Sequence, residues 1–157
     1  MKNISILICL LWMGFIFYNS SNSGVISQQM SRKVTRLVQN ESGEVTELNK
    51  MNFEKLNYIV RKNAHAFEYI VLAFMVSNAL FAFNKRGKKV GVYILFICLF
   101  YAVIDEFHQY FVPGRGSLVS DVLIDFGGSL IGVTFFYLAY YKIYRKYAIS
   151  RKESLKI

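Results

Sequence analysis

Cysteine, proline and acidic residues are scarce in this chain of 157 residues, which has two cysteines, one proline, and 10 acidic against 19 basic side chains. Cys9 and Cys98 lie inside hydrophobic runs without a pairing or metal-ligand spacing. They therefore indicate apolar packing rather than a disulfide framework or a cysteine metal site. A GxxxxGKS/T phosphate loop is also missing, so the DEFH tetrapeptide does not indicate a helicase, and neither HAFE nor DEFH is an HExxH zinc motif.

Long apolar runs are abundant instead, since 54% of the residues are hydrophobic. Four runs cover residues 4–18, 64–83, 90–112 and 122–141. The last three reach the roughly 20 residues that cross a hydrocarbon core of about 30 Å. A soluble protein of this length could not bury such helices on every side. The sequence therefore predicts an all-α integral membrane protein, a single domain over residues 1–157 formed by a bundle of four transmembrane helices.

The first run also resembles a secretory signal peptide, because Lys2 precedes a short apolar core and the polar stretch NSSNSG follows it. Bulky Trp12, Phe15, Phe17 and Tyr18 lie towards its end, where an aromatic belt suits a membrane interface better than a cleavage site. We therefore expect a retained helix. Either outcome exports the segment that follows.

Basic residues predict the orientation of the spans. Lys85, Arg86, Lys88 and Lys89 occupy the short link between the second and third runs, and lysine and arginine in short loops favour the cytoplasmic side. Both termini are then cytoplasmic, including the basic tail 142–157, and the loop 19–63 is external. The net charge of +9 is explained by basic flanks next to anionic lipid, so no nucleic-acid partner is expected.

The external loop contains a second amphipathic pattern. Apolar residues recur at helical spacing among basic ones, and a further turn leads into the second span. A helix lying on the membrane and a solvated surface helix both fit this pattern. The apolar residues of the pattern are Met30, Val34, Leu37 and Val38, its bases are Arg32, Lys33 and Arg36, and the further turn holds Leu56, Ile59 and Val60.

Ionisable side chains gather at the predicted outer ends of the second and third spans. Arg61, His65 and Glu68 are spaced i, i+4 and i+7, so they share one face of a helix. In the third span, His108 and Gln109 follow Asp105 at i+3 and i+4, whereas Glu106 points about 100° away from Asp105. We expect these groups at one depth, just below the external surface.

The fourth span adds two carboxylates and a stripe of small residues. Asp125 lies one turn after Asp121, and Gly128 and Gly132 continue the same side. A small-xxx-small face approaches a neighbouring helix closely, so both carboxylates should point into the bundle. Between the third and fourth spans, Pro113 disfavours helix at the residue before it and Gly114 permits a turn that brings Arg115 back over the polar groups.

These polar groups favour a binding or catalytic site, because each charge placed mid-membrane costs about 2.5–3.5 kcal/mol unless it is paired, hydrated or bound. Whether the site is catalytic stays open, and the cofactor is unknown. The alternative is a polar clamp that only fixes the helices, with Arg61, Lys62 and Arg115 balancing the acids. The candidate pocket comprises His65, Glu68, Asp105, Glu106, His108, Gln109, Asp121 and Asp125. A divalent metal would take its ligands from His65, Glu68, Asp105, His108, Asp121 and Asp125.

Three motifs, RKNAHAFEY, YAVIDEFHQYFVPGR and DVLIDFGG, resemble in order and spacing the VanZ-like family of small bacterial membrane proteins. The resemblance implies a multi-pass protein of the bacterial cell membrane, in a family named for a member that raises resistance to the glycopeptide teicoplanin. It supplies no mechanism. The positions that correspond to the family's motifs are Arg61, His65, Glu68, Tyr69, Asp105, Glu106, His108, Gln109, Pro113, Gly114, Arg115, Asp121, Asp125 and Gly128.

The resulting expectation is an outward-facing pocket that acts on, or binds, a lipid-linked or anionic component of the cell envelope. Arg61 and Arg115 would grip an anion such as phosphate. In an enzymatic version, His65 or His108 would transfer protons, positioned by Glu68 or Asp105. A structural or binding module without turnover is the alternative. Ion translocation is disfavoured, because residues 90–104 offer only Tyr93, Cys98 and Tyr101 as polar groups.

Overall fold

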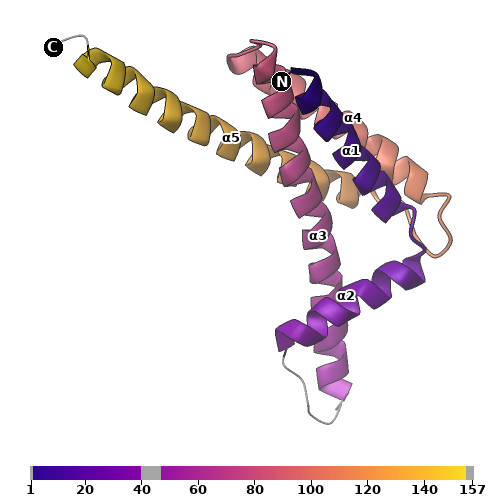
Figure 1. Cartoon of the computed structure of the whole chain (residues 1–157). Coiled ribbons are helices and arrows are strands. Elements are labelled where there is room, and N and C mark those ends of the chain that lie inside the picture. The colour runs from indigo at the N-terminus through magenta and orange to yellow at the C-terminus, as the bar shows by residue number, and fades with distance from the viewer. Residues whose placement is uncertain (1, 40–46, 155–157) are drawn as a thin grey trace.

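The protein is all-α, as its apolar runs predict (Figure 1). The computed structural model describes residues 2–39 and 47–154, and this part of the chain contains helices and no strand. The helices are α1 (Lys2–Ser20), α2 (Gly24–Gln39), α3 (Glu47–Ala82), α4 (Lys88–Gln109) and α5 (Val119–Ser154).

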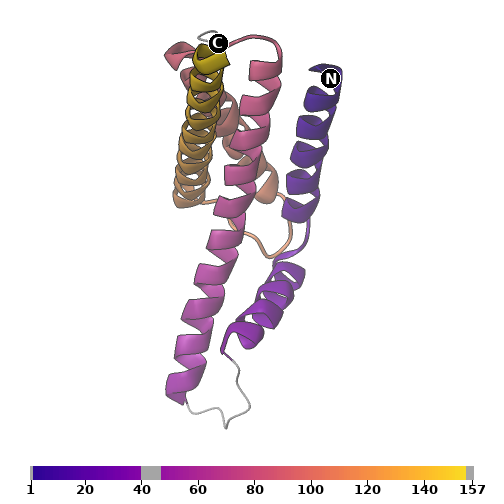
Figure 2. The same ribbon diagram turned by 60° about the vertical axis from the view of Figure 1, so that its left-hand side comes forward.

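Four of the described helices are long and apolar enough to cross a membrane. The apolar stretches are Asn3–Ser20 in α1, Asn52–Ala82 in α3, Lys89–Gln109 in α4 and Val119–Ile143 in α5. They confirm the four predicted runs and identify the chain as a membrane protein. The N-terminus, the α3–α4 turn and the end of α5 lie towards one end of the bundle, and α2 lies beyond the other (Figures 1 and 2).

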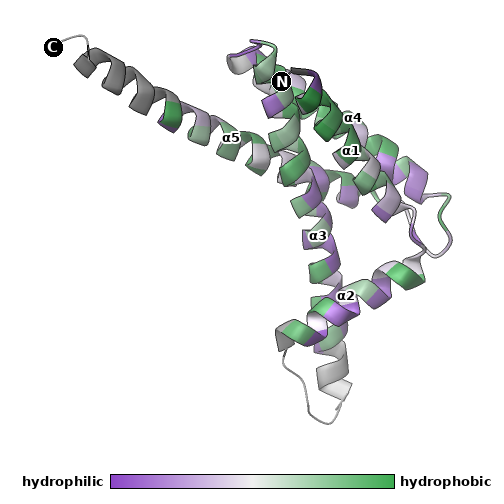
Figure 3. Ribbon diagram, viewed as in Figure 1, coloured by the Kyte–Doolittle hydropathy of each residue, from purple (hydrophilic) through white to green (hydrophobic). Residues whose placement is uncertain are grey.

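The surface of the bundle is apolar where lipid would surround it. Val92, Phe96 and Phe100 of α4 are 66%, 65% and 59% exposed, and large apolar side chains are similarly exposed along α1 and α5. A helix that is apolar on both its packed and its exposed side is typical of a membrane span. Figure 3 shows hydrophobic residues along most of α1 and more polar segments where α1 and α4 approach the α4–α5 loop.

Close packing of α3 on α5 holds the centre of the bundle, and these two helices share the largest interface between elements. A Cβ atom at Gly128 would overlap the carbonyl oxygen of Ala66, and one at Gly132 would overlap that of Ile70. The stripe of small residues therefore lets the two backbones touch, as predicted from the sequence. Around this seam, Tyr69, Leu72, Ile94, Cys98 and Ala102 are completely buried.

The helices and the predicted spans differ at several ends, and α5 continues through the predicted tail to Ser154. α4 ends at Gln109 rather than Val112, because Phe111 and Val112 donate their backbone N–H to the carbonyls of His108 and Gln109 in a tighter turn before Pro113. α3 begins at Glu47, so the turn predicted around Leu56 to Val60 is continuous with the second span. Residues 40–46 of the predicted external loop, and the side chain of Val38, lie outside the described part.

The α1–α2 turn and the α4–α5 loop meet at one end of the bundle, which we call the polar end (residues 19–24 and 110–118 with the helix ends around them). Gly24 donates its backbone N–H to the carbonyl of Pro113 at 3.1 Å. A side chain at Gly24 would overlap the backbone of Gly114, and Gly114 itself has a φ of 75°, which favours glycine. The two connections therefore cross backbone to backbone.

Candidate functional site

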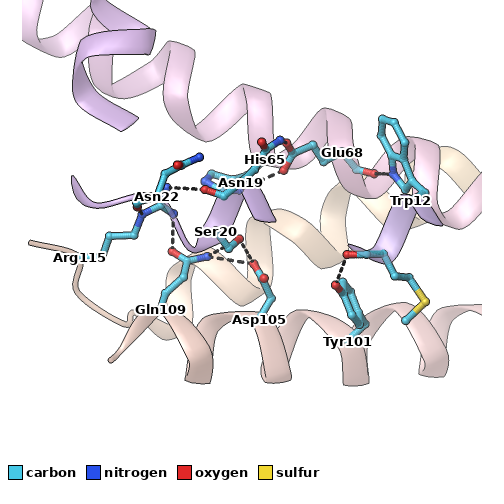
Figure 4. A network of polar contacts seen from close by, with 11 residues as sticks. Trp12, Asn19, Ser20, Asn22, His65, Glu68, Tyr101, Asp105, Gln109 and Arg115 are labelled. Carbon is cyan, nitrogen blue, oxygen red and sulfur yellow. Dashed lines mark hydrogen bonds and ion pairs between the residues drawn. The ribbon is translucent and has the colours of Figure 1, made fainter. Parts of the chain in front are cut away.

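Glu68 of α3 is held at the polar end by two side chains of α1 (Figure 4). Asn19 Nδ2 donates to Glu68 Oε1 at 2.7 Å, and Trp12 Nε1 donates to the Glu68 backbone oxygen at 3.0 Å. His65, one turn earlier on the same face, places Nδ1 3.5 Å from Glu68 Oε2. This separation suits an ion pair if the imidazole is protonated, but neither atom has a hydrogen-bond partner.

Asp105 is the centre of a second group of contacts, between α4 and the end of α1 (Figure 4). Asp105 Oδ2 accepts hydrogen bonds from Ser20 Oγ at 2.7 Å and from Gln109 Nε2 at 3.0 Å. Gln109 Oε1 in turn accepts from Arg115 Nη1 at 3.0 Å. A continuous chain of polar contacts thus joins α1, α4 and the α4–α5 loop.

Arg115 forms hydrogen bonds to the backbone of the α1–α2 turn and the end of α1. Its Nε donates to the carbonyl of Asn22 at 3.0 Å and its Nη2 to that of Asn19 at 3.3 Å. Burial lowers the pKa of the Arg115 guanidinium, the nearby Asp105 carboxylate raises it, and the Arg61 guanidinium lowers it further. Arginine stays charged at neutral pH despite such shifts. Arg115 therefore does bend back over the polar groups as predicted, but much of its donor capacity binds the protein itself.

Three carboxylates lie where α4 and α5 meet, Glu106 on α4 and Asp121 and Asp125 on α5, and they have different partners. Asp121 forms an ion pair with Lys62. Glu106 is buried and accepts a hydrogen bond from the backbone N–H of Leu118 at 2.8 Å. Asp125 is also buried, on the face that continues to Gly128. Both aspartates point into the bundle, in agreement with the predicted stripe.

Several buried polar atoms of the site have no hydrogen-bond partner within the protein. Besides the facing atoms of His65 and Glu68, they are Tyr69 OH, Asp105 Oδ1 and Asp125 Oδ1. An unsatisfied buried polar group costs about 1–3 kcal/mol. A helix clamp built only for stability would pair such atoms with one another. These unpaired atoms can therefore form hydrogen bonds with another molecule.

Two cavities open onto these groups and share Arg61, His65 and Arg115. The larger, of about 250 Å³, lies between α2 and α3. The smaller, of about 170 Å³, lies under the α4–α5 loop. The larger cavity is lined by Asn19, Asn22, Ser27, Met30, Ser31, Val34, Val60, Arg61, Ala64, His65, Glu68 and Arg115. The smaller is lined by Tyr58, Arg61, Lys62, His65, Gln109, Gly114, Arg115, Gly116, Leu118 and Asp121.

A third space, of about 10 Å³, lies below them and brings Glu106, Asp121 and Asp125 beside His65. This volume is enough for about one water molecule. His65 therefore borders all three spaces, which makes it the common side chain of the site.

His108 lies apart from the other predicted site residues. Its ring stacks on Phe17 with centroids 4.2 Å apart, and its Nε2 is 3.1 Å from Ser21 Oγ. It lines none of these three cavities. The i, i+3 spacing put His108 near the face of Asp105, but the aromatic side chain of α1 draws the imidazole to the outer side of α4.

Helix α1 contributes two site residues that the sequence analysis does not predict. Asn19 and Ser20 are a polar flank of the first run in the sequence, and in the structure they donate hydrogen bonds to Glu68 and Asp105. Two short polar residues immediately after an apolar span, opposite buried carboxylates, were the available signal. Tyr69 was indicated only by the family resemblance.

Among the described residues, no three His, Cys, Asp or Glu side chains are grouped so that they could hold one metal ion. Carboxylate oxygens of the candidate ligands contact other groups of the protein. Their partners include Ser20, Gln109, Asn19, Lys62 and Ser120.

Comparison with protein families matches residues 5–140 to the family model described as VanZ/LLP1. The match includes α1, α2 and the whole of the site. No curated protein and no solved structure matches the chain.

Proposed function

The chain belongs to the VanZ/LLP1 family, and from its site we propose that it binds a lipid-linked, phosphate-bearing component of the bacterial cell envelope at an outward-facing polar end. The orientation is supported by Lys85, Arg86 and Lys89, which are exposed at the opposite end of the bundle. Basic residues in a short connection favour the cytoplasmic side. Both ends of the chain are then cytoplasmic, and the protein is a multi-pass protein of the cell membrane.

The observation that carries the proposal is the uncommitted guanidinium of Arg61. Arg61 lines both larger cavities, and its one attractive side-chain interaction in the described part of the chain is with the Tyr58 ring, 5.9 Å from the guanidinium carbon to the centroid. The other cations nearby are engaged, Lys62 by Asp121 and Arg115 by backbone carbonyls and Gln109. A guanidinium at the wall of a cavity is suited to bidentate binding of phosphate.

Arg115 lies close enough to Arg61 for the two positive charges to repel each other. An anion held between the two guanidinium groups would relieve that repulsion. Of the two arginines predicted to bind phosphate, Arg61 therefore binds the anion directly, and Arg115 contributes a fixed positive charge beside it.

The apolar wall of the larger cavity supports a ligand that carries a hydrocarbon chain. Met30 and Val34 of α2 face Val60 and Ala64 of α3 across this cavity, while Arg61, His65 and Glu68 form its polar part. A free inorganic anion would leave the apolar half unused. A lipid-linked phosphate matches both halves, since ligand sites combine an apolar lining with a few placed polar groups.

Proton transfer at this site would fall to His65 rather than His108. His65 borders the cavities and has Glu68 beside it, which matches the general arrangement of a base and its orienting carboxylate. Binding of the ligand requires no proton transfer, so the proposal concerns binding only.

Any contribution of the protein to teicoplanin-type glycopeptide resistance would follow from binding of the lipid-linked phosphate at this site.

The second candidate is a polar clamp without a ligand, and one observation favours it. Asn19, Ser20, Gln109 and Arg115 all make hydrogen bonds that tie α1 and the α4–α5 loop together. A clamp requires the bound side chains but has no use for Arg61 or for the unpartnered hydroxyl of Tyr69.

A binding titration separates the two candidates. The purified protein in mild detergent is titrated with a polyprenyl phosphate and, separately, with inorganic phosphate. We expect saturable binding of the polyprenyl phosphate that weakens at least about tenfold, or 1.4 kcal/mol, in Arg61→Gln. Lys55→Gln is the matched control, because Lys55 is an exposed cation on the same helix. Equal binding by both variants, or none by the unaltered protein, would favour the clamp.

A further inference from the structure

Helix α2 exposes large apolar residues and buries two small polar residues against the protein. Ser31 and Thr35 are 7% and 0% exposed, and Asn57 of α3 is also buried at this level. On the other side, Met30 is 58% exposed and Leu37 is 79% exposed. A helix on the surface of a water-soluble domain shows the opposite arrangement, with its apolar stripe facing the core.

Four exposed apolar residues of α2 form one continuous stripe. Ile26, Met30, Val34 and Leu37 recur at spacings of three and four residues, which places them on one side of the helix. We call these four residues the outer stripe. Val34 is 47% exposed and Ile26 is 43% exposed, so every residue of the stripe is exposed in the described chain.

An ion pair joins α2 to α3, since Arg32 Nη2 lies 2.7 Å from a carboxylate oxygen of Glu54. The buried hydroxyl of Thr35 is satisfied within α2, because it donates to the carbonyl of Ser31. The helix contains no acidic residue, and Lys33 and Arg36 are exposed. The surface of α2 is therefore apolar and basic, the combination that binds anionic lipid.

The position of α2 brings this surface to the end of the membrane spans. α2 begins at Gly24, four residues after α1 ends at Ser20, and the Gly24 backbone is bonded to Pro113 in the loop that follows α4. Exposed Phe107, Tyr110 and Phe111 surround that loop, as aromatic residues do at a membrane–water interface. From there α2 runs obliquely across α3 rather than along it (Figures 1 and 2).

We propose that α2 lies in the interfacial region of the lipid leaflet at the polar end, with the outer stripe among acyl chains and with Lys33 and Arg36 at anionic headgroups. Of the two alternatives left open by the sequence, the proposal adopts the membrane-lying helix. Met30 and Val34 also line the larger cavity, so the cavity wall continues directly into the lipid-facing surface. A lipid chain could then enter between α2 and α3 from the leaflet without crossing water.

The test labels single introduced cysteines with an environment-sensitive fluorophore in vesicles that contain phosphatidylglycerol. Ile26→Cys and Leu37→Cys probe the outer stripe at positions that do not line the cavities. Gln28→Cys is the matched control, because Gln28 is an exposed polar residue on the far side of the same helix. The unaltered chain, whose Cys9 and Cys98 are buried, serves as the blank.

We expect blue-shifted emission at positions 26 and 37 that is quenched several-fold more strongly by lipids spin-labelled in the acyl chain than emission at position 28. Water-like emission at all three positions would overturn the proposal. Blue-shifted emission without quenching by labelled lipid would also overturn it, since protein, such as a second copy of the chain, would then cover the stripe. The result does not depend on whether a phosphate-bearing ligand binds at Arg61.

Discussion

Ser20, the last residue of α1, donates its hydroxyl to Oδ2 of the completely buried Asp105 on α4 at 2.7 Å. With the bonds from Asn19 and Trp12 to Glu68, this contact makes α1 one wall of the polar site. Ile16 of the same helix is completely buried against the bundle. A helix that supplies core packing and three hydrogen bonds is an integral element of the fold, as the retained-helix interpretation of the first apolar run requires. Its processing in the cell stays a prediction.

Replacing Ser20 should destabilise the protein. In Ser20→Ala, Asp105 Oδ2 keeps only the hydrogen bond from Gln109, and the loss for a bond to a charged or buried carboxyl is about 1–3 kcal/mol. Thermal unfolding in detergent should show a lower midpoint. Ser117→Ala in the exposed loop is the control and should change stability by less than about 0.5 kcal/mol. Equal effects of the two substitutions would mean that the Ser20 bond is unimportant.

The α3–α5 seam gives a prediction with a neighbouring control. A methyl group in Gly128→Ala would overlap the Ala66 carbonyl, so the helices must move apart and the unfolding midpoint should fall. A Cβ at Gly127 meets nothing within 4 Å, so Gly127→Ala should be neutral or stabilising by up to about 1 kcal/mol through helix propensity. A loss of stability in Gly127→Ala as large as that in Gly128→Ala would contradict the described packing.

The buried Tyr69 and the partly buried Tyr101 differ in their hydrogen bonding. Tyr69 OH has no hydrogen-bond partner, whereas Tyr101 OH donates to the Met13 carbonyl at 2.5 Å. Tyr101→Phe should therefore lower the free energy of unfolding by about 1 kcal/mol, and Tyr69→Phe should not lower it. Tyr69 lines none of the three cavities, so neither substitution should change ligand binding directly. If Tyr69→Phe lowers the free energy of unfolding as much as Tyr101→Phe does, the Tyr69 hydroxyl has a hydrogen-bond partner and the prediction is wrong.

The two histidines should behave differently. His65 borders the three cavities, and His108 packs on Phe17 outside them. We expect His65→Ala to weaken ligand binding and to abolish any teicoplanin resistance that the protein confers, at normal abundance in the membrane. His108→Ala should keep both properties in protein that remains folded. Susceptibility assays on cells expressing each variant, with abundance measured in parallel, provide the check, and the reverse result would move the site to His108.

Helical periodicity and hydropathy were sufficient to predict the spans and the gathering of polar groups at one end. The stripe from Asp121 to Gly132 also predicted correctly which side of the fourth span packs closely on a neighbouring helix, because small residues allow helices to touch. These features depend on spacing within one helix. They can therefore be predicted from the sequence without knowing which helices contact one another.

Contacts between helices were less predictable. The rotamer of His108 depends on the position of Phe17, and the role of Ser20 depends on which helix end lies opposite Asp105. The amphipathic pattern of α2 is visible in the sequence, but it does not tell which side of the helix faces the protein. Ser31 and Thr35 satisfy their hydroxyls on carbonyls of α2 itself, and they are buried only because α2 packs on α3.

The most direct test of the central claim is native mass spectrometry of the protein purified in mild detergent from cells that express it. The account predicts a co-purified lipid that carries phosphate, retained by the unaltered protein and by Lys55→Gln but lost from Arg61→Gln. A protein that carries no such lipid, or an Arg61→Gln variant that retains it as fully as Lys55→Gln does, would contradict the account.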